Sequence, residues 1–453
     1  MAGIFKAYDI RGVYPEQINE GIARKIGLAY STVFPELKRV VVSMDYRKSS
    51  PSLKKALVDG LVEGGKDVFD LGSSSTPLFY FTVRHHGFDG GLMVTASHNP
   101  KEFNGVKVQG KNNESISWEK GLDKIEQVVK ASAFARPDVK GKASALDYHA
   151  IEKEYLSFVS GRAGQGLGLK VVLDCGNGAC GLVPEKALKA AGCEVETLYA
   201  EPDGDFPNHL ADPHDAHTLG ALQKRVVETR ADLGLAFDGD GDRLGAVDEK
   251  GNVLTADQLL MLFTRQALSV KKGKCVFEVR CSDALFEDTR KHGGTPVMAR
   301  VGHGYIPEEL GENGVFGGEL SGHLFFPYCY YNYDDAIFAA LKLAEIAAAS
   351  KPFSSRVASL PSYHASPEIF IDVKDEEKFA LVGKIASSLA EKFEVDSTDG
   401  ARVRTKNAWG LVRASNTTSH LKLRFEGRTR EALEEVMDVF RKELGRLGLE
   451  LKA

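Results

Sequence analysis

Residues 39–71 read RVVVSMDYRKSSPSLKKALVDGLVEGGKDVFDL. The stretch opens with an apolar, β-branched run at residues 39–44, which is typical of a buried strand. A pattern typical of a helix follows from Ser50 to about Glu63, and a second strand-like run follows at residues 67–71. A strand, a helix and a second strand in this order predict a βαβ unit and therefore a parallel or mixed sheet.

The same pattern opens twice more along the chain, at residues 169–174 and 274–279. Each unit later reaches a strand that ends in a tightly turning polar loop. These loops lie at residues 95–100, 238–243 and 317–323, and an apolar stretch follows each of them. A recurring pattern of this kind predicts three related α/β domains that each present one loop at an equivalent place.

The C-terminal part of the chain has a different pattern. Strand-like runs at residues 369–373, 410–413 and 421–425 precede an amphipathic helical pattern at residues 433–447. This order predicts a smaller α+β domain with antiparallel strands. The predicted fold class is therefore α/β, with three related mixed-sheet α/β domains and a C-terminal α+β domain. The predicted domain boundaries are 1–147, 148–250, 251–364 and 365–453.

Composition and charge argue against several classes of protein. The 453 residues are 43% hydrophobic and 27% charged, which is ordinary for a globular protein. A net charge of −5, without a long basic run, argues against nucleic acid as the main partner. The most apolar helical run, at residues 336–349, is too short to span a bilayer. The first residues lack the pattern of a signal peptide, and six cysteines without a CxxC pair predict reduced thiols in a cytoplasmic protein.

The loop at residues 238–243 carries three aspartates separated by single glycines. Asp238, Asp240 and Asp242 are packed so closely that their carboxylates repel each other unless a cation lies among them. An EF-hand is excluded because Arg243 stands where the calcium loop needs glycine. Three carboxylates instead suit an octahedral Mg²⁺ that keeps a position for a phosphate oxygen. Arg243 could hold that phosphoryl group or steady the carboxylates.

The loop at residues 95–100, Thr-Ala-Ser-His-Asn-Pro, offers a hydroxyl nucleophile in Ser97. The loop lacks the Gly-x-Ser-x-Gly pattern of a hydrolase elbow, and His98 is poorly placed as a base because it directly follows the serine. Lys107, on the next predicted strand, could reach back to the serine oxygen, and Arg11 is a second candidate cation. A serine and a divalent-metal site in one chain indicate phosphoryl transfer.

Two further loops have polar groups that suit a sugar phosphate. Glu319, Ser321 and His323 combine a carboxylate, a hydroxyl and an imidazole, which can hydrogen-bond the vicinal hydroxyls of a sugar and move protons. Residues 413–418, Arg-Ala-Ser-Asn-Thr-Thr, combine an arginine with small hydroxyls and predict a cradle for a phosphate dianion. An ordinary turn is the alternative for each of these two loops.

Taken together, these loops resemble the motifs of the α-D-phosphohexomutase superfamily, and most closely those of its phosphomannomutase/phosphoglucomutase branch. Six motifs occur in the family's order and span nearly the whole chain, so the resemblance is highly specific. They are KAYDIRG (6–12), TASHNP (95–100), FNGVK (103–107), DGDGDR (238–243), GELSGH (318–323) and RASNTT (413–418). The sequence FPNH at residues 206–209 is a further match.

The resemblance implies four domains around a central active-site cleft. It also implies that Ser97 is carried as a phosphoserine and that the Mg²⁺ ligands are Ser97, Asp238, Asp240 and Asp242. The implied catalytic residues are Ser97, Arg11, Lys107 and His323. His323 is the candidate general acid/base, with Lys107 and Arg11 as competitors. The implied substrate-binding residues are Tyr8, His98, Arg243, Arg280, His303, Glu319, Ser321, Arg413, Ser415, Asn416 and Thr417.

The activity that the resemblance implies is the reversible conversion of a hexose 1-phosphate, of mannose or glucose, into the hexose 6-phosphate. The phosphoserine gives its phosphoryl group to the sugar, and Ser97 takes back the group from the other end of a 1,6-bisphosphate. The implied cofactors are Mg²⁺ and, as activator, glucose 1,6-bisphosphate or mannose 1,6-bisphosphate. Hexose phosphates are the expected partners, without nucleic acid or membrane, and the chain is expected to be a monomer or homodimer.

Other activities remain as alternatives. A phosphoglucosamine mutase shares the chemistry, although Leu320 and the sequence of residues 413–418 favour mannose and glucose. A Mg²⁺-dependent sugar phosphatase and a non-catalytic sugar-phosphate sensor are two further alternatives. The chain departs from the family at Arg280, where lysine is frequent, and at residues 302–304, where serine or alanine is expected after the histidine. Both departures lie in the predicted third domain, which the resemblance implies tunes the choice of substrate.

Overall fold

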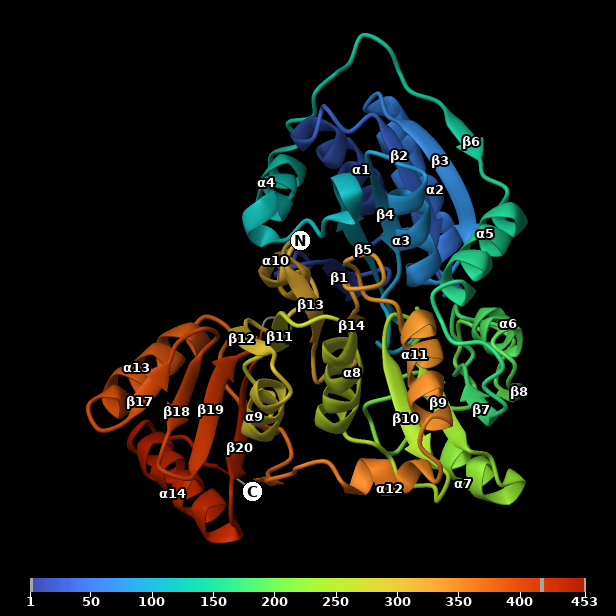
Figure 1. Ribbon diagram of the computed structural model, residues 1–453. Helices are drawn as coiled ribbons and strands as arrows, with labels where there is room; N and C mark the ends of the chain where they lie inside the picture. Colours follow the sequence, from blue (N-terminus) through green and yellow to red (C-terminus); the bar gives the residue numbers. More distant parts are fainter. Residues whose placement is uncertain (1–2, 416–418, 452–453) are drawn as a thin grey trace. The chain divides into compact units, whose positions relative to one another are not determined.

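A computed structural model of the chain describes residues 3–415 and 419–451 (Figure 1). The predictions for Asn416 and Thr417 therefore concern residues outside the described part. The chain packs into two compact units, of which the first comprises residues 1–263 and 321–359 and the second comprises residues 264–320 and 360–453. Among the described residues, no helix is long and apolar enough to cross a membrane.

The first sheet of the first unit is mixed and has the strand order β1-β5-β4-β2-β3-β6. Its strands are β1 (Ile10–Val13), β2 (Arg39–Met44), β3 (Asp67–Ser73), β4 (Gly90–Val94), β5 (Phe103–Gln109) and β6 (Ala143–Ala145). β2 pairs in parallel with both β3 and β4, whereas β5 runs antiparallel to β4 and β1. The predicted βαβ unit is confirmed, because the helix between β2 and β3 is α2 (Ser50–Glu63).

Helices and short turns accompany this sheet, whose strands run from blue to blue-green in Figure 1. They are α1 (Glu20–Val33), α2, α3 (Thr76–His85), η1 (Lys111–Asn113), η2 (Trp118–Lys120), α4 (Leu122–Ala131) and α5 (Tyr148–Ser160). The side chain of Asn19 caps α1, and that of Ser75 caps α3 with Pro77 in the first turn. Buried Val40 and Val42 of β2 belong to a core cluster shared with α1 and α2.

The second sheet of the first unit has the order β10-β9-β7-β8. Its strands are β7 (Lys170–Asp174), β8 (Glu194–Leu198), β9 (Leu233–Phe237) and β10 (Leu244–Asp248). β7, β8 and β9 are parallel, and β10 returns antiparallel to β9. The other elements of this unit are α6 (Val183–Ala190), α7 (Gly220–Thr229), β14 (Leu324–Phe325), α11 (Ala336–Ala348) and α12 (Phe353–Ala358). Helix α8 (Ala256–Val270) carries the chain from the first unit into the second.

The second unit contains a parallel arrangement and an antiparallel sheet. β11 (Lys274–Glu278) pairs in parallel with β12 (Thr295–Ala299) and β13 (Gly314–Gly318), and α9 (Asp283–Lys291) and α10 (Tyr305–Leu310) connect them. The antiparallel sheet has the order β15-β20-β19-β18-β17, with β16 also paired to β20. Its elements are β15 (His364–Ala365), β16 (Ile369–Asp372), α13 (Lys378–Ala390), β17 (Glu394–Asp396), β18 (Ala401–Arg404), β19 (Ala408–Ala414), β20 (His420–Gly427) and α14 (Arg430–Arg446).

The predicted fold class is confirmed, because mixed and parallel α/β sheets precede a C-terminal antiparallel sheet with helices. The strands expected near residues 369–373, 410–413 and 421–425 are present as β16, β19 and β20. The first unit contains two of the sheets, so its limits do not test the predicted domain boundaries. Those boundaries stay predictions.

Candidate active site

The serine loop of the first unit follows β4 and carries Ser97 in a strained, buried position. Ser97 adopts a left-handed backbone conformation with φ of 50°, and it is 1% exposed. Its amide donates to Thr95 Oγ1 at 3.0 Å. Its hydroxyl donates to Asp238 Oδ2 at 2.5 Å, so the fold joins the two loops that the sequence predicted to act together.

The aspartate loop follows β9, and Asp238 organises its backbone. Asp238 Oδ1 accepts hydrogen bonds from the amides of Gly241, Asp242 and Arg243, at 2.9, 3.0 and 3.2 Å. Gly241 has φ of 83°, which favours glycine at this point of the turn. Because backbone amides occupy Oδ1, the second oxygen of Asp238 is the one directed to Ser97.

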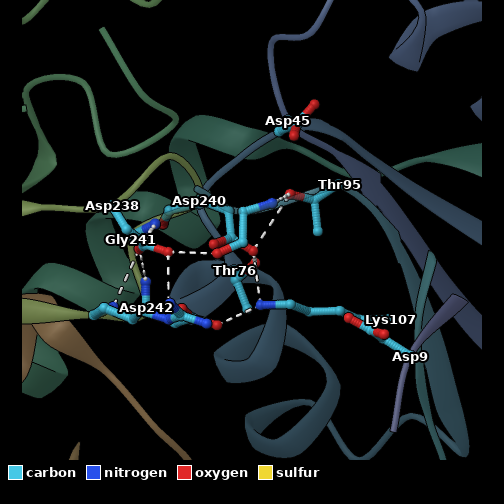
Figure 2. Close-up of polar contacts among 12 residues, drawn as sticks. Asp9, Asp45, Thr76, Thr95, Lys107, Asp238, Asp240, Gly241 and Asp242 are labelled. Atoms are coloured by element: carbon cyan, nitrogen blue, oxygen red, sulfur yellow. Dashed lines mark hydrogen bonds and ion pairs between the residues drawn. The ribbon is translucent and has the colours of Figure 1, made fainter. Parts of the chain in front are cut away.

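The side chain of Lys107, on β5, lies against the other two aspartates, as Figure 2 shows. Its ammonium is 2.7 Å from Asp240 Oδ2 and also pairs with Asp242. Thr76 Oγ1 donates to the same Asp240 oxygen at 2.7 Å. Lys107 was predicted to reach towards the serine oxygen, and in the structure its ammonium contacts these carboxylates.

The three carboxylates fit a divalent cation. They are fully buried, and their oxygens lie within 4.8 Å of one another. Asp240 Oδ1 is inaccessible and has no hydrogen-bond partner among the described residues. A buried carboxylate oxygen without a donor is costly unless a cation binds it, and hard oxygen ligands suit Mg²⁺. The donor set therefore supports the predicted magnesium site, which Ser97 Oγ adjoins.

Charge at the aspartate loop also favours a cation. Burial, followed by the repulsion of Asp242 and Asp240, raises the pKa of Asp238 well above its ordinary value. Burial also opposes ionisation of Asp240 and Asp242. Lys107, together with Thr76 at Asp240 and with His323 and Arg243 at Asp242, outweighs burial, and the pKa of both carboxyls is lowered. A bound cation would further stabilise the negative charge of the three carboxylates.

His98, which directly follows the serine, lies in contact with its hydroxyl. Its Nδ1 lies 3.2 Å from Ser97 Oγ. Consecutive side chains on a strand point to opposite faces, but the left-handed backbone at Ser97 removes that restriction. Burial, followed by the nearby Arg243 and Arg11, lowers the pKa of His98 well below its ordinary value. His98 is therefore a neutral imidazole beside the nucleophile at neutral pH.

The remaining predicted residues of the first unit border the same two loops. Arg11 Nη1 donates to Asn99 Oδ1 at 2.6 Å in the serine loop. Arg243 Nε lies 3.2 Å from His323 Nε2, and His323 Nδ1 lies 3.1 Å from Ser321 Oγ. His323 Nε2 also lies 3.4 Å from Asp242 Oδ1, so the imidazole lies between a guanidinium and a carboxylate. Tyr8 lies near enough to Arg243 to influence its pKa.

The second unit contains the predicted substrate-binding residues of β11, β13 and β19. Arg280 Nε donates to Glu278 Oε1 at 2.9 Å, and its Nη1 donates to Glu368 Oε1 at 3.2 Å. Glu319 Oε1 accepts the amide of Gly302 at 2.6 Å, beside the buried His303. Ser415 is 1% exposed and follows the end of β19.

Asp399 connects the predicted phosphate loop to the loop that holds His303. Its Oδ2 accepts from Arg413 Nε at 3.1 Å and lies 3.0 Å from Arg413 Nη2. The same oxygen accepts the amide of Val301 at 3.0 Å. Arg413 is 3% exposed, so this carboxylate fixes a buried guanidinium.

Several residues of these sites were not found from the sequence. Thr76 and Glu368 contact predicted residues from distant segments, whereas Glu278 and Asp399 do so from nearby ones, and none of the four belongs to a recognised motif. Asp334 lies 3.6 Å from His323, and burial together with Asp242 raises its pKa to about 7. The paired acids of Asp334 and Asp335 before an apolar helix were the available signal for this last residue.

Comparison with known proteins gives an unambiguous family. Four successive family models match, described as phosphoglucomutase/phosphomannomutase alpha/beta/alpha domains I, II and III and the C-terminal domain. They match residues 2–136, 152–251, 255–363 and 368–443.

Relatives match along the whole length. A phosphomannomutase/phosphoglucomutase of Pseudomonas putida is 38% identical over 99% of this chain and 97% of its own length. A probable phosphoglucosamine mutase of Methanosarcina acetivorans is 35% identical over 97% of this chain and 98% of its own length. The crystal structure of a phosphoglucomutase/phosphomannomutase family protein from Burkholderia thailandensis is 34% identical, with a TM-score of 0.91 over 99% of this chain and 98% of that one.

Fold, site and relatives together define a phosphohexomutase enzyme. The chain belongs to the phosphoglucomutase/phosphomannomutase family, as its motifs predicted.

Replacing Gly239 with alanine is expected to disturb the contact between the two loops. A Cβ at this position would lie 2.4 Å from the backbone oxygen of Ser97, which cannot move as a flexible side chain can. We expect a loss of about 1–3 kcal/mol in the free energy of unfolding, and a lower kcat because Ser97 is displaced. Thermal unfolding and mutase assays measure the two effects.

Gly383 provides the matched control, because a Cβ there meets nothing within 4 Å. Gly383→Ala lies within α13 and should be neutral or slightly stabilising. If Gly239→Ala kept the kcat and the Tm of the unchanged protein, the close approach of the two loops would not exist in solution.

Proposed function

We propose that this enzyme interconverts the 1-phosphate and 6-phosphate of mannose, glucose or both, through a phosphoserine at Ser97 and a hexose 1,6-bisphosphate. The observation that carries this proposal is the 2.5 Å hydrogen bond from Ser97 Oγ to Asp238, one of three clustered buried aspartates. A hydroxyl in such a place can exchange a phosphoryl group beside a cation, which a hydrolytic triad would not require.

We infer that Ser97, Asp238, Asp240 and Asp242 hold Mg²⁺. When bound, the ion supplies positive charge to the transferring phosphoryl group. Lys107 keeps two of the carboxylates ionised and therefore ready to act as ligands. The backbone amides on Asp238 Oδ1 fix the direction of its other oxygen.

The cations around Ser97 are assigned to the reacting phosphoryl group. Arg11 is anchored to the serine loop through Asn99, and Arg243 follows the aspartate loop directly, so both guanidiniums can stabilise charge that develops on phosphoryl oxygens. His323 is the proposed general acid/base, since an imidazole that lies beside Asp242 and Asp334 can exchange a proton with a sugar hydroxyl. His98, next to Ser97 Oγ, is proposed to contact the substrate's reacting phosphate.

The second unit is proposed to bind the remainder of the substrate. Arg413, together with Ser415, Asn416 and Thr417, is assigned to the phosphate that is not being transferred. The residues proposed to bind the sugar ring and its substituents are Arg280, His303 and Glu319, together with Ser321 of the first unit. Binding energy from a distant phosphate orients the sugar for transfer at the other end.

Arg413→Ala is expected to weaken binding of both the 1-phosphate and the 6-phosphate. A charge-assisted hydrogen bond contributes about 1.5–3 kcal/mol, so KM should rise roughly 10-fold to 100-fold for each substrate. Steady-state kinetics in both directions measure the change. Arg441→Ala is the control, because Arg441 lies on the exposed face of α14 in the same unit and pairs with Asp438. An unchanged KM for both substrates would remove Arg413 from the site.

The function is tested by ³¹P NMR of the purified protein with Mg²⁺ and a catalytic amount of glucose 1,6-bisphosphate. Mannose 1-phosphate, glucose 1-phosphate and glucosamine 1-phosphate are supplied separately. Conversion to the 6-phosphate is the expected result, with mannose and glucose faster than glucosamine. Release of inorganic phosphate would instead identify a phosphatase, and binding without turnover would identify a sensor.

Phosphoglucosamine is the second candidate substrate. The relative from Methanosarcina acetivorans bears that name at 35% identity, which favours keeping this alternative. Leu320 and the sequence of residues 413–418 favour mannose and glucose, because relatives that act on glucosamine differ there. The relative rates in the NMR experiment separate the two substrates.

We further propose that glucose 1,6-bisphosphate or mannose 1,6-bisphosphate activates the enzyme by phosphorylating Ser97. The proposed location is the cytoplasm, supported by cysteines that are all free thiols, five of them buried. A monomer or homodimer is proposed, and light scattering would distinguish the two.

A further inference from the structure

Arg47 is a fully buried arginine at the end of β2, beneath the serine loop. Its exposed fraction is 1%, which is rare for a guanidinium unless all its donors are satisfied. Asp45 holds it locally, because Asp45 Oδ1 accepts the amide of Arg47 at 3.0 Å and Asp45 Oδ2 accepts Arg47 Nε at 3.1 Å. Ser50 Oγ donates to Asp45 at 2.5 Å and fixes that carboxylate to the start of α2.

The two terminal nitrogens of Arg47 bind backbone oxygens of the serine loop. Nη2 donates to the carbonyls of Ser97 and Asn99, at 2.7 and 2.6 Å. Nη1 donates to the carbonyls of Pro100 and Phe103, at 2.7 and 3.1 Å. With Nε on Asp45, all five N–H donors of the guanidinium are used.

These contacts fix the direction of the Ser97 side chain. The carbonyl of Ser97 faces Arg47, and Gly239 of the aspartate loop approaches the same oxygen. Ser97 has φ of 50°, a conformation that costs energy for a residue with a side chain and persists only where its surroundings hold it. Because Cβ and the carbonyl carbon are bonded to the same Cα, holding the backbone fixes the direction of the Cα–Cβ bond, from which the hydroxyl reaches Asp238.

The segment that contains Gly204 and Phe206, which follows β8 in the first unit, packs against Arg47. The ring of Phe206 lies 5.1 Å from the guanidinium carbon, in a cation–π arrangement. Gly204 approaches the carbonyl of Tyr46 so closely that a Cβ would meet it at 2.4 Å. Arg47 is thus enclosed, and the carbonyls that it binds would lose its N–H donors with its replacement.

We propose that Arg47 is a positioning residue for phosphoryl transfer, which fixes the left-handed conformation of Ser97 through three backbone carbonyls of its loop and the carbonyl of Phe103 at the start of β5. The proposal rests on the proposed function, because it assigns Arg47 an effect on the phosphoserine step. Lysine cannot replace this arrangement, since an ammonium has three donors on one atom and lacks the planar fork that reaches carbonyls in different directions.

The test compares Arg47→Lys with Arg402→Lys in the full-length protein. Arg402 is also fully buried, donates to the carbonyl of Cys281 at 3.0 Å and stacks on Trp409 at 3.9 Å, but it lies in the second unit. Both variants lose a buried guanidinium, so a general cost in stability appears in both. The readouts are Tm, kcat, KM and the single-turnover rate at which ³²P leaves phosphorylated Ser97 for a hexose 1-phosphate.

We expect Arg47→Lys to lower kcat and the single-turnover rate roughly 100-fold, the effect of displacing a reacting group by about 1 Å. KM should stay within about threefold, because substrate-binding groups are untouched. Arg402→Lys should keep the single-turnover rate. If folded Arg47→Lys transferred phosphate at the rate of the unchanged protein, or if both variants lost the same fraction, the proposal would be overturned.

A second variant guards against failure of Arg47→Lys to fold. Asp45→Asn keeps the shape of the side chain and removes the charge that holds Arg47 Nε. It should lower the single-turnover rate roughly 10-fold, again with little change in KM. An unchanged rate in folded Asp45→Asn would contradict the proposal. An unchanged protein that turns over no hexose phosphate, or carries no phosphate on Ser97, would overturn the proposed function itself and this inference with it.

Discussion

Ser97→Ala is expected to lower kcat by roughly 10⁴-fold or more, because the variant has no oxygen to carry the phosphoryl group. The hydroxyl that is lost is the one held 2.5 Å from Asp238. The substitution is small and removes no backbone contact, so hexose phosphates should still bind with a similar Kd. Mutase assays and isothermal titration with glucose 1-phosphate measure the two quantities, and mass spectrometry should detect phosphate on the unchanged protein alone.

Ser43→Ala is the matched control for this experiment. Ser43 is as buried as Ser97 and donates to the carbonyl of Gly72 at 3.0 Å within the same sheet, away from the aspartate loop. It should cost some stability and leave kcat nearly unchanged. Full turnover in Ser97→Ala would reject the phosphoserine and leave the aspartate site to explain the activity by another route.

The second large effect is expected from Asp240→Asn, which should lower kcat roughly 10²-fold to 10³-fold and weaken Mg²⁺ binding. The buried Oδ1 of Asp240 has no hydrogen-bond partner among the described residues, so a cation is its best-supported ligand. The amide keeps the shape but lacks the charge, and loss of one preorganised electrostatic contact typically costs this much. Removal of Mg²⁺ by a chelator should abolish turnover of the unchanged protein reversibly.

Asp248→Asn is the control, because this buried aspartate accepts amides in the hairpin turn after β10 and lies outside the metal site. It should alter stability without altering the concentration of Mg²⁺ that gives half-maximal activity. A titration of Mg²⁺ against activity, together with direct calorimetry, separates the two variants. If Asp240→Asn required no more Mg²⁺ than the unchanged protein, Asp240 would not be a ligand.

Local patterns in the sequence predicted much of the fold. Residues 39–71 predicted β2, α2 and β3, because a strand and an amphipathic helix each bury an apolar face of fixed period. The aspartate loop predicted a cation site in the same way, since three carboxylates spaced two residues apart repel each other unless a cation lies among them. Its approach to Ser97 was predicted from a family resemblance and is present in the structure.

The surroundings of these loops could not be predicted from local pattern. Arg47 lies 50 positions from Ser97 in the chain, and only the pairing of β2 with β4 brings them together. Asp399 reaches Arg413 and Val301 in the same way, across segments that share no periodicity. The contact of His98 with Ser97 Oγ could not be predicted, because it depends on φ at Ser97, which is a property of the folded loop.

The single oxygen of Asp399 that binds both Arg413 and the amide of Val301 has a consequence for how such an enzyme can be redesigned. Residues 302–304 include His303, which is proposed to bind the sugar, and the adjacent Val301 shares its anchor with the guanidinium that is proposed to bind phosphate. Under this assignment, a change in sugar selectivity is expected to change the affinity for the phosphate as well, because both depend on Asp399. Laboratory evolution towards another hexose is therefore expected to need compensating changes near Asp399. Variants changed only at residues 302–304 are expected to gain selectivity for the new hexose and to lose affinity for the substrate phosphate.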